Sequence, residues 1–128
     1  MKTLLSFMLM IAFHVAIGQS PSEKIVQKQV DAYNQRNIDQ FMATYSSHIE
    51  LYLFPDSLLM SGKEAMRKHY QTMFEAAPDL SCMIINRIGM GNNVIDREYV
   101  KRNGKYLDAI AIYKVEQDSI VRVTFILE

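Results

Sequence analysis

Apolar and polar residues alternate along most of the second half of the chain, and a period of two is typical of β-strands that bury one face. The alternation breaks at three short stretches rich in Gly, Asn, Asp and Ser, which are the usual turn residues. One of them, Asn103-Gly104, is the dipeptide preferred in a two-residue hairpin turn. The pattern therefore predicts four antiparallel strands over 80–88, 94–102, 106–116 and 120–127.

Between residues 20 and 76 the apolar positions recur mainly at helical spacing. Ser20, followed by Pro21 and Glu23, carries three common signals of a helix start. Helices early and strands late indicate an α+β fold, in which three N-terminal helices pack on one face of a curved, mostly antiparallel sheet. The predicted elements of this half are a helix from 20 to about 33, a short helix over 38–45, a strand over 48–54 and a helix from 61 or 62 to about 76.

The first 18 residues differ in character from the rest of the chain. One lysine precedes an apolar run over 4–17, and small residues at Ala16 and Gly18 have the spacing that a signal peptidase reads. We therefore expect residues 1–18 to be a signal peptide cleaved after Gly18, and residues 19–128 to form a single exported domain, periplasmic or secreted. The apolar run is shorter than a typical transmembrane helix, so no membrane span is expected in the mature form. An uncleaved N-terminal anchor is the alternative.

Composition and charge mainly exclude classes of function. The chain has 128 residues with 14 basic and 14 acidic side chains, so no charge footprint points to nucleic acid. The single cysteine, Cys82, cannot form an internal disulfide, and we expect it to be a buried, unreactive thiol. His48, Glu50 and His69 lack the compact spacing of metal ligands, so we expect neither a metal nor a cofactor.

Two carboxylates interrupt the second of the predicted late strands, in the stretch VIDREYV. In an extended strand Asp96 and Glu98 share one face with the apolar residues Val94 and Val100, whereas Arg97 points to the opposite face. Acids on a half-apolar face are either matched by buried partners or prepared for proton transfer. The sequence leaves both interpretations open.

Four segments carry a resemblance to a known family: QKQVDAYNQRNIDQFMATYSSHIELYLFP (27–55), GKEAMRKHYQTMFE (62–75), NRIGMGNNVIDREYV (86–100) and AIAIYKVEQDSIVRVTFI (109–126). They resemble SnoaL-like proteins of the nuclear-transport-factor-2-like superfamily, in which ketosteroid isomerases are distant relatives. The resemblance implies a cystatin-like cone of helices and curved sheet around a pocket. The superfamily contains isomerases, cyclases, epoxide hydrolases, dehydratases and members without catalysis, so it implies a fold and no particular reaction.

The catalytic groups of the ketosteroid isomerases are absent at the corresponding positions. The resemblance places Gln29 where those enzymes have the oxyanion-hole tyrosine, Leu53 where they have the base, and Ala111 where they have the protonated aspartic acid. The Arg-x-Asp motif of the epoxide hydrolases is also missing, because the residue two positions after Arg97 is Tyr99 and not an aspartate. We therefore expect neither mechanism.

The same resemblance turns the face with Asp96 and Glu98 toward the interior of the cone, opposite the first helix. Keeping two neighbouring carboxylates ionised in a low dielectric costs free energy. One of the two acids is therefore expected to have a raised pKa. Asp96 and Glu98 are therefore the catalytic candidates. The predicted ligand-binding residues are Gln29, Tyr33, Leu53, Ala109, Ala111, Tyr113 and Phe125.

The predicted function is binding of a small apolar molecule, with cofactor-free proton transfer of the isomerase, cyclase or dehydratase type. The alternative is a non-catalytic binding or stabilising module that dimerises or recruits a partner through its sheet. Ile110, Ile112 and Ile126 are expected on the outer face of the sheet, where they are too apolar for bare solvent. That face predicts a homodimer.

Overall fold

The computed structural model describes residues 18–128, so the predicted signal peptide lies almost entirely outside the described residues. Three helices and six strands follow one another along the described chain. In chain order they are α1 (Pro21–Asn34), α2 (Ile38–Ala43), β1 (Tyr45–Leu53), β2 (Ser57–Ser61), α3 (Lys63–Ala76), β3 (Ser81–Met90), β4 (Asn93–Arg102), β5 (Lys105–Glu116) and β6 (Ser119–Leu127).

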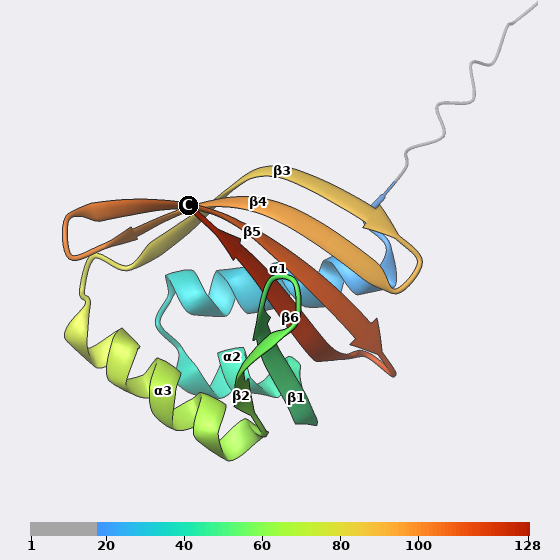
Figure 1. The fold of residues 1–128 in the computed structure, drawn as a ribbon, viewed down its shortest axis with the longest axis horizontal. Coiled ribbons are helices and arrows are strands. Elements are labelled where there is room, and N and C mark those ends of the chain that lie inside the picture. Colours follow the sequence, from blue (N-terminus) through green and yellow to red (C-terminus); the bar gives the residue numbers. More distant parts are fainter. Residues whose placement is uncertain (1–17) are drawn as a thin grey trace, which may run out of the picture.

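All six strands belong to one curved sheet, and the three helices lie on one side of it (Figure 1). The strand order is β2-β1-β6-β5-β4-β3, and every neighbouring pair is antiparallel except β1 and β6. The predicted α+β class, the three helices and the mostly antiparallel sheet are therefore confirmed. None of the helices among residues 18–128 is long and apolar enough to cross a membrane.

Strand β2 was not predicted from the sequence. It pairs with β1, with Leu51 opposite Met60 and Tyr52 opposite Leu58. Its residues Leu58, Leu59 and Met60 form an unbroken apolar run without the alternation of a half-buried strand, and the first two are about half exposed. This edge strand is held by its hydrogen bonds to β1, which the local pattern does not report.

The starts of α1 and α2 are stabilised by side-chain caps, whereas α3 begins after Gly62 without one. Ser20 accepts a hydrogen bond from the backbone N–H of Glu23 at 3.2 Å, and Pro21 begins α1, as predicted. Asn37 caps α2 in the same way, accepting from the N–H of Gln40 at 3.1 Å. The α2 helix ends at Ala43, earlier than predicted. The chain then enters β1, whose first residue pairs with Ile120 of β6.

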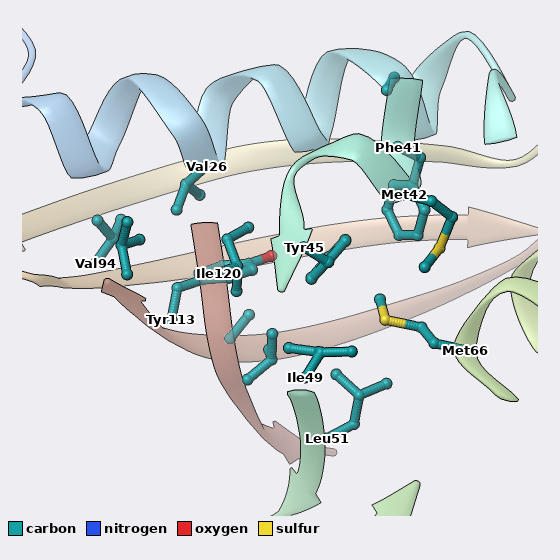
Figure 2. Close-up of a cluster of buried hydrophobic side chains, with 14 of the residues drawn as sticks. Val26, Phe41, Met42, Tyr45, Ile49, Leu51, Met66, Val94, Tyr113 and Ile120 are labelled. Carbon is teal, nitrogen blue, oxygen red and sulfur yellow. The ribbon is translucent and has the colours of Figure 1, made fainter. Parts of the chain in front are cut away.

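The hydrophobic core lies between the helices and the sheet (Figure 2). Phe41 of α2 is at its centre and is fully buried, with ring centroids of Tyr45, Tyr70 and Phe74 at 5.1, 4.8 and 5.4 Å. Aromatic contacts of this geometry add to the free energy gained from burial. Tyr45 belongs both to this core and to the cavity described below.

A β-bulge in β3 changes which of its side chains face the helices. Ile84 pairs with Glu98 on β4, but the next pairs are Asn86 with Arg97 and Arg87 with Asp96, so Ile85 is an extra residue. A bulge reverses the alternation beyond it. Arg87 therefore lies on the same face as Asp96, whereas strict alternation from Ile84 would place it on the outer face.

Candidate functional site

The two acids of strand β4 lie on one face, as the alternation predicts, and this face points to the interior, as the family resemblance implies. Asp96 is fully buried and Glu98 is 6% exposed, and Val94 of the same face is also fully buried. Arg97 lies on the outer face, where it forms an ion pair of 2.7 Å with Asp108 of β5.

A cavity of about 540 Å³ lies between the helices and the concave side of the sheet. Its size is within the range of small-molecule sites. The side chains of its buried end include those of Gln29, Tyr45, Glu98 and Tyr113, and its exposed end lies at the β4–β5 turn. The residues that line it are Gln29, Val30, Tyr33, Tyr45, Tyr70, Met73, Cys82, Glu98, Val100, Arg102, Asn103, Lys105, Tyr106, Leu107, Ala109, Tyr113, Phe125 and Leu127.

Glu98 is the acid that borders this cavity. Its carboxylate accepts a hydrogen bond of 2.9 Å from the hydroxyl of Tyr113. Burial, followed by the nearby charge of Asp96, raises the pKa of Glu98 to about 7, against the lowering effects of Tyr113, Cys82 and Arg87. A carboxyl with a pKa near neutrality can both accept and donate a proton at physiological pH.

Asp96 has a different environment and does not line the cavity. The guanidinium of Arg87 binds both of its carboxylate oxygens, with Nε to Oδ1 at 2.7 Å and Nη2 to Oδ2 at 2.8 Å. The remaining nitrogen, Nη1, donates to Gln27 of α1 at 2.7 Å. This bidentate pair matches the charge of Asp96 and ties β3 and β4 to α1.

The neutral polar groups of the cavity are an amide and several phenols. Gln29 is 6% exposed, and its Oε1 has no hydrogen-bond partner within residues 18–128. The hydroxyl of Tyr33 points to Met73 Sδ at 3.9 Å. Burial raises the pKa of Tyr33, Tyr45 and Tyr70, so these phenols keep their protons and act as hydrogen-bond donors.

The structure brings most, but not all, of the predicted site residues together. Those that line the cavity are Glu98, Gln29, Tyr33, Ala109, Tyr113 and Phe125. Ala111 is fully buried opposite Asp96, and its methyl group lies in the core. Leu53 is a half-buried residue at the end of β1, next to Phe125 in the parallel ladder.

Several residues of the site were missed. Arg87 was not predicted as a site residue, because the bulge that turns it inward cannot be recognised from the local sequence pattern. The alternation of β4 beyond Val100 does place Arg102 on the inward face, and the register of the hairpin then places Lys105 opposite Arg102. Cys82 lines the cavity and is only partly buried, rather than buried as predicted, and this burial raises the pKa of its thiol. Within residues 18–128 no three His, Cys, Asp or Glu side chains are grouped closely enough to hold a metal ion.

Several solved structures share this fold. A cystatin-fold protein from Novosphingobium aromaticivorans is 24% identical over 84% of this chain and 98% of its own, with a TM-score of 0.76. An NTF2-like protein of unknown function from Cytophaga hutchinsonii is 17% identical over 88% and 94%, with a TM-score of 0.74. A Kribbella flavida protein proposed to be a ketosteroid isomerase is 15% identical over 84% and 78%, with a TM-score of 0.75. At these identities the likeness shows the fold alone.

No curated protein matches the sequence. The family model of the SnoaL-like domain matches residues 26–123, which include all three helices except the start of α1, and nearly the whole sheet. The order of elements, the curved sheet and this match agree with one another. The chain belongs to the SnoaL-like domain family.

Proposed function

We propose that this domain binds a small, mainly apolar molecule in the cavity and moves a proton on it by means of Glu98, without a cofactor. The observation that carries the proposal is the position of Glu98, a buried carboxyl on the wall of a largely apolar cavity with a pKa of about 7. Perturbed carboxyls of this kind are concentrated at sites of acid–base chemistry.

The chemistry follows from the groups present. Glu98 as carboxylate takes a proton from a carbon next to a carbonyl group, so that a C–H bond breaks and the electron pair moves into the carbonyl as an enolate. The phenols of Tyr33, Tyr45 and Tyr70 line the same cavity and are donors suited to the developing oxyanion. Return of the proton at another carbon completes an isomerisation, and the same enolate serves cyclisation or elimination.

Asp96 has a positioning role in this proposal. Its charge, held in place by Arg87, contributes to the raised pKa of Glu98. In this proposal each of the two interpretations given for the acid pair applies to one of the two acids. Asp96 is the carboxyl matched by a buried partner, and Glu98 is the one available for proton transfer.

The test uses 2-tetralone, a small apolar ketone with acidic α-protons, dissolved in D₂O. We expect the protein to accelerate exchange of these protons by about 10²-fold or more over buffer, as general acid–base catalysis does. The exchange is followed by loss of the ¹H NMR signal. Glu98→Gln is expected to abolish the acceleration, whereas Glu64→Gln, the same substitution at an exposed position of α3, leaves it intact.

Two results would count against this proposal. If Glu98→Gln still accelerates proton exchange, Glu98 is not the proton-transfer group. Binding of 2-tetralone without exchange would favour the non-catalytic binding module.

The outer face of the sheet supports an additional proposal, a homodimer. Ile88 and Met90 of β3 are 67% and 80% exposed in the single chain, and Ile95 of β4 is 39% exposed. Ile110 and Ile112 of β5 continue this apolar surface toward β6. Exposed apolar patches of this kind are typical of protein interfaces, and a two-fold dimer covers the same patch on both copies.

A further inference from the structure

The inward face of the β4–β5 hairpin changes in character along its length. Three cross-strand pairs follow one another from the turn into the interior: Arg102 with Lys105, Val100 with Leu107, and Glu98 with Ala109. All six residues line the cavity. The wall therefore begins with two cations at the exposed end, continues with two aliphatic side chains and ends at the buried carboxyl.

The two cations at the turn directly oppose each other. Residues paired across an antiparallel ladder have Cβ atoms about 5 Å apart, and like charges in this position repel. Within residues 18–128 neither Arg102 nor Lys105 takes part in an ion pair. Asp79, the acid bound to this turn, accepts its hydrogen bonds from the backbone N–H groups of Asn103 and Gly104, both at 2.7 Å.

A second pair of opposed cations shows how such repulsion is otherwise relieved. Lys114 and Arg122 face each other between β5 and β6 on the outer side of the sheet. There Lys114 binds Glu116 at 3.2 Å, and the guanidinium of Arg122 lies 3.9 Å over the ring of Tyr52. The inner pair lacks both kinds of partner among the described residues and is open to the cavity.

We infer that the ligand of the cavity is an amphiphilic anion, a mainly apolar molecule with one terminal carboxylate or similar acidic group held between Arg102 and Lys105. This inference rests on the proposed function and names the class of molecule that the same site takes. Its apolar body lies along Val100 and Leu107, and its far end reaches Glu98. Arg102 is four positions along the strand from Glu98, which corresponds to about 13 Å.

The buried end of the cavity adds a requirement on the far end of the molecule. Gln29 Oε1 is an acceptor without a partner among the described residues, and a buried acceptor without a partner costs free energy. A hydroxyl or N–H group on the ligand satisfies it. The ligand is thus an anion at its exposed end and a hydrogen-bond donor at its buried end.

Two dyes with the same skeleton test the anionic end. 1-Anilinonaphthalene-8-sulfonate carries an acidic group, and N-phenyl-1-naphthylamine lacks it; both fluoresce on entering an apolar site. We expect the double variant Arg102→Gln/Lys105→Gln to weaken binding of the sulfonate about tenfold, because bonds to charged groups are worth this much, and to change binding of the neutral dye less than twofold. Lys114→Gln/Arg122→Gln is the matched control and is expected to alter neither.

The outcomes separate this inference from the proposed function. If the neutral dye binds and Arg102→Gln/Lys105→Gln does not weaken binding of the sulfonate dye, the inference of an anionic ligand is wrong. The proposal of an apolar binding site is then unaffected. If neither dye binds, both proposals fail. Leu107→Trp fills the cavity between its two ends and is expected to weaken both dyes, so dye binding that survives this substitution lies elsewhere and contradicts the inference.

Discussion

Arg87 and Asp96 lie opposite each other on β3 and β4, and the guanidinium of Arg87 binds both oxygens of the Asp96 carboxylate. The Asp96 side chain is fully buried and that of Arg87 is 12% exposed. The pair exists because one extra residue, Ile85, reverses the direction of the side chains that follow it in β3. It isolates Asp96 from the cavity and leaves Glu98 as the acid there.

We expect Arg87→Met to lower the free energy of unfolding by about 3–5 kcal/mol, because it leaves the Asp96 carboxylate buried without its counter-charge. Urea unfolding measured by circular dichroism checks this. The matched control is Arg97→Met, which breaks the exposed pair with Asp108 and is expected to cost less than about 1 kcal/mol. Equal losses of unfolding free energy in the two variants would contradict the idea that the buried Arg87–Asp96 pair stabilises the fold more than the exposed Arg97–Asp108 pair.

Glu98 makes stability depend on pH in a predictable direction. Its pKa is raised from 4.5 to about 7 in the folded protein, so the folded state holds the proton more tightly than the unfolded state. The stability gained from this is fully present below pH 4.5 and is lost as pH rises through about 7. The difference corresponds to about 3 kcal/mol.

Glu98→Gln removes this titration. We therefore expect the variant to gain stability relative to the wild type as pH rises from about 4.5 to 8, and the difference between the two unfolding free energies to follow the pKa of Glu98. Urea unfolding at several pH values measures it. Glu64→Gln is expected to keep the wild-type dependence. A difference between wild type and Glu98→Gln that is constant over this range would disprove the raised pKa.

The hydroxyl of Tyr113 holds the pKa of Glu98 down by its hydrogen bond of 2.9 Å. Tyr113→Phe is expected to move the pKa of Glu98 upward by about 1 pH unit, the value of one hydrogen bond to a charged group. NMR titration of Glu98 labelled with ¹³C at its side-chain carboxyl reports this directly. Tyr45→Phe removes a phenol from the same cavity, without a hydrogen bond to Glu98 in the described structure, and is expected to have a smaller effect. A lower pKa in Tyr113→Phe would contradict the assigned role.

We propose that the protein is exported and begins at Gln19 after cleavage. Expression of the full chain in a secreting host, followed by intact mass measurement of the exported fraction, is expected to show a chain of residues 19–128. Replacement of Ala16 by Glu, which alters the small residue before the cleavage position, is expected to block processing. An exported chain that retains Met1 would support the uncleaved anchor instead.

The outer sheet face predicts self-association. Sedimentation velocity at micromolar concentration is expected to show a dimer of residues 19–128, and Ile112→Asp is expected to convert it to a monomer, because a charge is buried at the interface. Lys28→Asp places an acid on an exposed position of α1, away from this face, and is the control. A wild-type monomer under these conditions would remove the proposed dimer.

Much of this structure follows from short-range pattern. The Ser20 cap, the strand alternation and the Asn103-Gly104 turn each depend on neighbours in sequence, and the structure has all three. The same holds for the placement of Asp96 and Glu98 on one face, since strand parity is a local property. That this face points inward was predicted from the family resemblance and not from parity. Strand β2 is the exception among the elements, because its pairing with β1, rather than burial of one face, holds it in place.

The different fates of the two acids were decided only by tertiary structure. Asp96 and Glu98 are equivalent by alternation, and they became distinct because the bulge at Ile85 brought Arg87 to one of them and the cavity reached the other. A bulge depends on how two strands pair, and a cavity depends on how helices meet a sheet. Neither is encoded within a few neighbouring residues, so the local pattern located the pair of acids, and packing between distant segments determined which of them borders the cavity.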